Sequence, residues 1–75
     1  MDIEQRLQRL QERYRSALSA AVLAKAQYFS LAGEASATAA AVQRAAIHWQ
    51  QIEARKKAIV ARMVYVEQLA RDAVA

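Results

Sequence analysis

Two groups of basic side chains are the residues best suited to binding chemistry in this sequence of 75 residues. Arg6, Arg9 and Arg13 are three and four residues apart, a spacing that places them on one stripe of a helix. A second group lies in residues 55–62. Guanidinium and ammonium groups bind phosphate oxygens, and a net charge of +4 favours a polyanionic ligand. If the chain binds nucleic acid, we expect the contacts at Arg6, Arg9, Arg13, Arg55, Lys57 and Arg62.

The same basic groups also suit a protein ligand. Acidic residues are interspersed with both groups and reduce their charge, namely Glu4, Glu12, Glu53 and Glu67. Arginine is moreover common beside the apolar seams through which helices bind one another. The two kinds of ligand stay open at this point.

Residues that carry out catalysis or hold metals do not occur in a productive pattern. The sequence has no cysteine and one histidine, His48, so it offers no zinc ligand set. Its serines have no base at a suggestive spacing, and no glycine-rich phosphate loop is present. We expect His48, next to Trp49, to be an ordinary half-buried histidine. The sequence predicts a protein that is not an enzyme and needs no cofactor or metal.

The elements that must carry these side chains are helical. Nineteen alanines, with many leucine, glutamine, glutamate and arginine residues, favour helix almost everywhere, and no stretch alternates as strands do. A seven-residue repeat of apolar or small residues, typical of coiled coils, runs along the chain. Its seam positions are Ile3, Leu7, Leu10, Tyr14, Ala17, Ala21, Ala24, Tyr28, Leu31, Ala35, Thr38, Val42, Ala45, Trp49, Ile52, Lys56, Ile59, Met63, Val66, Ala70 and Ala73. The sequence predicts one all-α domain, residues 1–75.

Two features favour a coiled-coil-like hairpin over one helix of about 110 Å. Gly33 can take the left-handed conformation that ends a helix, and Ser36 or Thr38 can cap the next one. If the chain folds back there, large seam residues face small ones, as in the pair Ala24 and Trp49. We predict antiparallel helices over residues 3–32 and 37–72, joined by a turn at 33–36.

The sequence also predicts a cytoplasmic protein. Its start is polar and lacks the basic-then-apolar order of a secretory signal. The longest weakly charged run, residues 16–33, contains Lys25 and falls short of the about 20 apolar residues of a membrane span.

One seam does not use all the apolar residues of the chain. The surplus is Leu18, Val22, Leu23, Phe29, Ile47, Val60, Val64, Tyr65 and Leu69. A two-helix hairpin has no third layer to cover them, and large apolar patches mark binding surfaces. Self-association into a four-helix bundle, as a homo-oligomer, and binding to a different protein both cover this surface. We expect partner-binding residues at Leu23, Phe29, Ile47, Trp49, Ile59, Val60, Val64, Tyr65, Val66 and Leu69.

The segment WQQIEARKKAIVARMVYVEQLA, residues 49–70, resembles the second helix of the small two-helix co-chaperones of type III secretion needle subunits. The shared features are the chain length, a glycine at the turn, and the pairs Trp49-Gln50, Ala58-Ile59 and Tyr65-Val66. The resemblance implies a bacterial cytoplasmic protein that joins a tetratricopeptide-repeat chaperone. It also implies that apolar residues of the second helix, outside the seam, dock on that chaperone.

Two functions are therefore expected from the sequence. The first is a non-enzymatic protein-protein interaction module, such as a small chaperone or assembly-factor subunit. The alternative is a dimeric four-helix bundle that binds nucleic acid, or acts as a regulator, through the basic groups near the start of the first helix and in the middle of the second.

Overall fold

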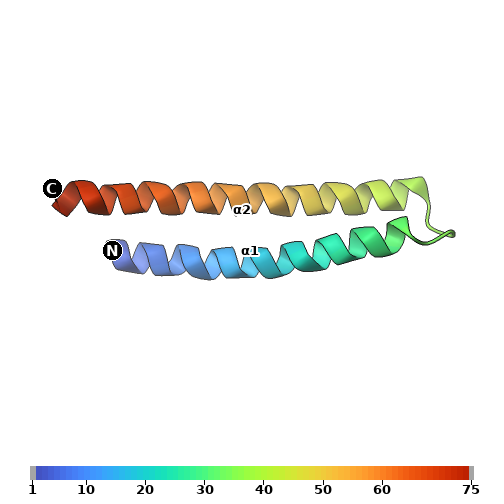
Figure 1. The fold of residues 1–75 in the computed structure, drawn as a ribbon, viewed down its shortest axis with the longest axis horizontal. Helices are drawn as coiled ribbons and strands as arrows, with labels where there is room; N and C mark the ends of the chain where they lie inside the picture. Colours follow the sequence, from blue (N-terminus) through green and yellow to red (C-terminus); the bar gives the residue numbers. More distant parts are fainter. Residues whose placement is uncertain (1, 75) are drawn as a thin grey trace.

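The chain folds into an antiparallel pair of long helices (Figure 1). A computed structural model describes residues 2–74, in which α1 (Ile3–Ala32) and α2 (Ala39–Val74) pack against each other along their length. The molecule measures 59 × 15 × 15 Å, about half the length of one continuous helix. The predicted all-α hairpin is confirmed.

Side-chain caps decide where both helices begin. The Asp2 carboxylate accepts a hydrogen bond from the backbone N–H of Gln5 at 2.7 Å, and α1 has the predicted bounds. The Thr38 hydroxyl accepts one from the backbone N–H of Ala41 at 3.1 Å. Because Thr38, and not Ser36, caps α2, this helix begins at Ala39 instead of residue 37 and continues to Val74.

Gly33 ends α1 without the left-handed conformation that we expected. Its φ of −86° and ψ of −7° are right-handed helical values, and its N–H donates to the carbonyl of Phe29 at 3.1 Å. A further backbone hydrogen bond, from Ala37 to the carbonyl of Glu34 at 3.2 Å, closes the connection. The chain reverses over residues 33–38 rather than 33–36, and this longer connection makes a positive φ unnecessary.

The core is the predicted seam, divided into two clusters. Toward the free ends of the helices, Leu10, Ala17, Ile59 and Val66 are buried, and Ile3, Leu7, Tyr14 and Met63 pack against them. Nearer the connection, Ala21, Ala24 and Ile52 are buried beside Ala20 and Trp49. Every buried residue within 2–74 is a predicted seam position, and Ala24 and Trp49 share a cluster as their sizes suggested. Three of the buried residues are alanines, so the core contains few large side chains and contributes limited stability.

The two helices differ in length. α2 has 36 residues and α1 has 30, and the end of α2 projects past the start of α1 (Figure 1). Val74, in this projecting end, is 89% exposed. Across residues 2–74, neither helix combines the length and the apolar character needed to cross a membrane.

Candidate binding surfaces

Large apolar side chains are exposed on both helices, outside the seam. Their exposed fractions lie between 41% and 64%, and they belong to Leu18, Val22, Leu23, Phe29, Ile47, Val60, Val64 and Tyr65. The predicted surplus is confirmed at these positions. Leu69 differs from the expectation because it is half-buried, three residues after the buried Val66 and beside the seam.

One flank of the hairpin carries apolar side chains from both helices. Tyr14 of α1 and Val60 of α2 line the same hollow there. Leu18 and Val22 follow Tyr14 by one and two helical turns, and Val64 follows Val60 by one turn. Leu18, Val22, Val60 and Val64 therefore face the same side of the hairpin. We call this surface the apolar flank. It is defined as Leu18, Val22, Val60 and Val64, together with Phe29 and Trp49, whose rings lie near each other toward the connection.

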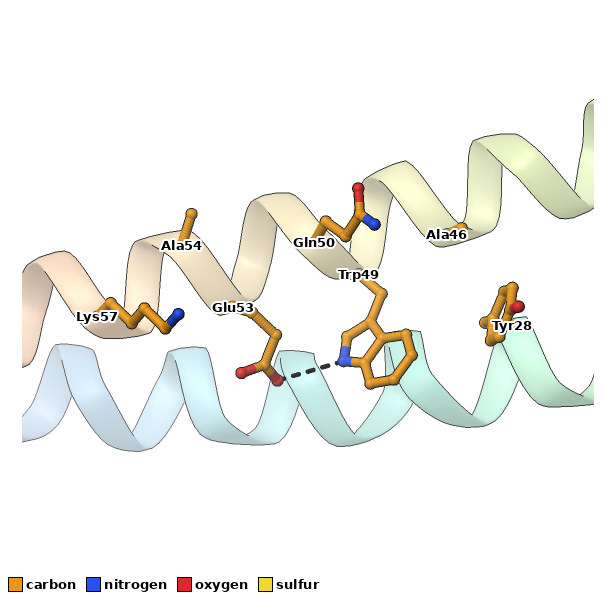
Figure 2. A pocket seen from close by; sticks show the side chains of 7 residues that line it. All are labelled: Tyr28, Ala46, Trp49, Gln50, Glu53, Ala54 and Lys57. Carbon is orange, nitrogen blue, oxygen red and sulfur yellow. Dashed lines mark hydrogen bonds between the residues drawn. The ribbon is translucent and has the colours of Figure 1, made fainter.

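A second hollow, of about 480 Å³, continues the apolar flank toward the connection (Figure 2). Its lining residues are Tyr28, Ala46, Trp49, Gln50, Glu53, Ala54 and Lys57. Figure 2 shows Tyr28 on α1 and the Trp49 ring reaching across from α2 toward α1. Glu53 and Lys57 line both hollows, so the two adjoin.

Three aromatic rings form the end of the apolar flank nearest the connection. Ring centroids are 5.3 Å apart for Tyr28 and Phe29, 5.7 Å for Tyr28 and Trp49, and 6.0 Å for Phe29 and Trp49. These separations are typical of favourable aromatic pairs. Phe29 is 57% exposed although both neighbouring rings are half-buried, so it offers an aromatic surface held in place by its neighbours.

A charged network crosses the middle of the apolar flank. The Glu53 carboxylate accepts hydrogen bonds from the indole N–H of Trp49 at 3.2 Å and from the ammonium of Lys56 at 3.3 Å (Figure 2 shows the first). The Lys56 hydrogen bond lowers the pKa of Glu53 from its ordinary value, with smaller contributions from Trp49 and from the charges of Lys56 and Lys57. The network holds the Trp49 ring beside the second hollow.

The other side of the interface between the helices carries a row of arginines. Three adjoining hollows there are lined by Arg6, Arg9 and Arg13 of α1 and by Arg55 and Arg62 of α2. Their remaining lining residues are small or apolar, and none of them is acidic or a lysine. We call this surface the arginine groove.

Within the described residues, the arginines of the groove form no salt bridge with an acidic side chain. Within residues 2–74, the one salt bridge is between Lys56 and Glu53, on the opposite flank. Asp2, near Arg6 in the sequence, uses its carboxylate to cap α1. The guanidinium of Arg62 lies over the ring of Tyr65, 5.6 Å from its centroid, an arrangement that orients it and preserves its charge.

One of the six predicted basic residues lies apart from the other five. The structure brings Arg6, Arg9, Arg13, Arg55 and Arg62 together, but it places Lys57 among the lining of the apolar flank. Arg55 and Lys57 are two residues apart, which rotates their side chains by about 200° around the helix. The spacing in the sequence indicates this grouping. Arg6 and Arg13 are separated by one seven-residue repeat, as are Arg55 and Arg62, so each pair lies on one side of its helix.

The expected partner-binding residues divide among several environments. Ile59 and Val66 are 5% and 2% exposed and belong to the core, so their side chains hold the helices together instead of facing a partner. Trp49 is half-buried at the edge of the apolar flank, and Tyr65 lies beneath Arg62, next to the arginine groove. Ala46, Gln50 and Ala54, which line the second hollow, were not expected, because small or polar residues outside the seam carry no sequence signal.

The side chains that could hold a metal ion are dispersed over the described residues. Among residues 2–74, no group of three or more His, Cys, Asp or Glu side chains is placed to hold a metal ion. His48 is exposed and not half-buried as expected, because it lies beside the seam instead of in it.

A comparison with protein-family models, curated proteins and solved structures finds no match to this chain. The resemblance of residues 49–70 to type III secretion co-chaperones therefore stays a prediction.

Proposed function

We propose that this protein is a non-enzymatic protein-protein interaction module that binds its partner through the apolar flank. The observation that carries the proposal is the exposure of Leu18, Val22, Val60 and Val64, which helical spacing from Tyr14 and Val60 places on one side of the two-helix hairpin. The hairpin supplies a rigid scaffold, and the exposed side chains supply the apolar contact area.

The apolar flank can contribute substantial binding free energy. Full burial of a Val, Leu or Phe side chain is worth about 1.5–3 kcal/mol. Val22, Phe29, Val60 and Val64 are between 43% and 62% exposed. Covering their exposed portions is therefore worth roughly 1 kcal/mol each, before the entropy cost of association. Lys57 and Glu53, which line both hollows of this flank, would select the orientation of the partner.

Within this class, we propose a role as a small chaperone or assembly-factor subunit in the bacterial cytoplasm. The resemblance of residues 49–70 to type III secretion co-chaperones supports a tetratricopeptide-repeat chaperone as the partner. The exposed positions of α2, Val60 and Val64, agree with docking through residues outside the seam. A second copy of the chain, forming a four-helix bundle, is the competing occupant of the same flank.

The experiment compares one substitution at two exposed valines. Val64→Asp places a carboxylate in the apolar flank, whereas Val74→Asp makes the same change in the projecting end of α2. Tagged wild-type and variant chains are purified from the native host, and the mass and composition of each complex are determined by native mass spectrometry. We expect Val64→Asp to lose the complex and Val74→Asp to retain it.

Each outcome has a defined meaning. Recovery of a different protein supports the assembly-factor role, and recovery of a homodimer alone would replace it with self-association through the same flank. A wild-type chain that is always monomeric would contradict the proposal, as would a Val64→Asp variant that keeps its partner. Far-ultraviolet circular dichroism confirms that both variants are as helical as the wild type.

A further inference from the structure

We propose that the arginine groove is a second binding site, separate from the apolar flank, which binds the phosphate backbone of a nucleic acid without reading its sequence. Five arginines from two helices converge on one groove, and no acidic residue lines it. The net charge of the whole chain is +4, so the groove concentrates more positive charge than the chain carries overall.

The distribution of acids and lysines makes this groove distinct from the rest of the surface. Glu53, one of the acids expected to dilute the basic groups, faces the apolar flank and pairs with Lys56. Lys57 lines that flank as well. The hairpin thus places arginine alone in the groove, and arginine binds phosphate with two parallel hydrogen bonds, which lysine cannot do.

The spacing of the arginines suits a chain of phosphates. Arg6 and Arg13 are seven residues apart, as are Arg55 and Arg62, and seven residues advance a helix by about 10.5 Å. One strand of duplex DNA carries a phosphate about every 3.4 Å along its axis. Each row of the groove therefore extends over about three phosphates.

The floor of the groove favours a nucleic acid over a protein helix. Leu10, Ile59 and Val66 line it but are only 7%, 5% and 2% exposed. A bound protein helix would find little apolar surface to cover there, and protein interfaces depend on such a core. Phosphate contacts need no apolar surface, because their affinity comes from charge neutralisation and counterion release.

The test compares two variants that each lose three positive charges. Arg6→Gln, Arg13→Gln and Arg62→Gln together remove charge from the groove. Lys25→Gln, Arg44→Gln and Arg71→Gln together are the matched control, since none of these three residues lines the groove. All six side chains are exposed and glutamine is a good helix former, so both variants should fold, which circular dichroism verifies.

Binding is measured by fluorescence anisotropy with a single-stranded RNA and a duplex DNA of about 20 nucleotides, between about 50 and 200 mM salt. Five phosphate contacts predict that wild-type affinity for the duplex falls about 500-fold over this range. The groove variant keeps two phosphate contacts, so its affinity for the duplex should fall only about twelvefold over the same salt range. At low salt it should bind more weakly than the wild type. The control should keep the wild-type slope, and the preferred probe identifies the form of nucleic acid bound.

Several results would overturn the proposal. They are a wild-type chain that binds neither probe at low salt, equal losses in the two variants, stronger binding to phosphatidylserine-containing vesicles, and displacement of the probe by polyglutamate as readily as by RNA. The Val64→Asp variant separates the two sites. If it loses its protein partner and still binds nucleic acid, both proposals hold, and each can fail without the other.

Discussion

Truncation of Ile59 tests whether this residue stabilises the hairpin or serves the binding surface. Ile59 is 5% exposed in the cluster that contains Leu10, Ala17 and Val66. Ile59→Ala removes three carbon atoms, worth about 0.8 kcal/mol each, so the loss of transfer free energy is about 2.4 kcal/mol. A small cavity term raises the expected cost to about 3 kcal/mol. A single core in a chain this short provides only a few kcal/mol, so the variant should be largely unfolded in isolation.

The assay is urea denaturation followed by circular dichroism at one fixed protein concentration, because association would add to the apparent stability. Val60→Ala is the matched control. Val60 is the next residue of α2 but is 43% exposed on the apolar flank, so its truncation should cost less than about 1 kcal/mol. Equal losses for the two variants would refute the assignment of Ile59 to the core. A larger loss for Val60→Ala would mean that the apolar flank is already buried in an oligomer.

Two further predictions concern the connection and the charged network. Gly33→Ala should raise the free energy of unfolding by about 0.4–1 kcal/mol, since the backbone of Gly33 is right-handed and a Cβ would lie 3.5 Å from the Phe29 carbonyl oxygen, an ordinary contact. A lower urea midpoint would instead indicate a left-handed glycine. The pKa of Glu53 is lowered in the folded chain, so its contribution to stability is present above the ordinary value of 4.5 and is lost as the pH falls through the lower folded value. Thermal unfolding of Glu53→Gln between pH 6 and pH 3 should accordingly depend less on pH than that of the wild type, and identical pH profiles would contradict the role of Lys56.

The fold was more predictable than the binding surfaces. Every buried residue in 2–74 is a seam position of the seven-residue repeat, although many other seam positions are only half-buried. The Thr38 cap was one of two candidates in the sequence, and only the hydrogen bond to Ala41 distinguishes it from Ser36. The conformation of Gly33 was not predictable, since a glycine allows either hand and the length of the connection decides between them.

The binding surfaces depended on how the helices meet. Arg6 with Arg13, and Arg55 with Arg62, share a helix stripe from spacing alone. Whether the two pairs lie on the same side depends on the antiparallel pairing of α1 and α2, because a single continuous helix would hold them far apart. The same pairing separates Lys57 from the arginines.

The sequence by itself therefore determined the helices, their seam and the presence of surplus apolar and basic residues, because these follow from the local preference for helix and from the 3.6-residue turn. Only the tertiary structure decided which side of the hairpin each of those residues faces. The packing of α1 on α2 divides the surface into an apolar flank and an arginine groove, and it assigns Ile59 and Val66 to the core between them. The physical reason is that a side chain's neighbours on the other helix are set by the direction and register of packing, which no single helix encodes.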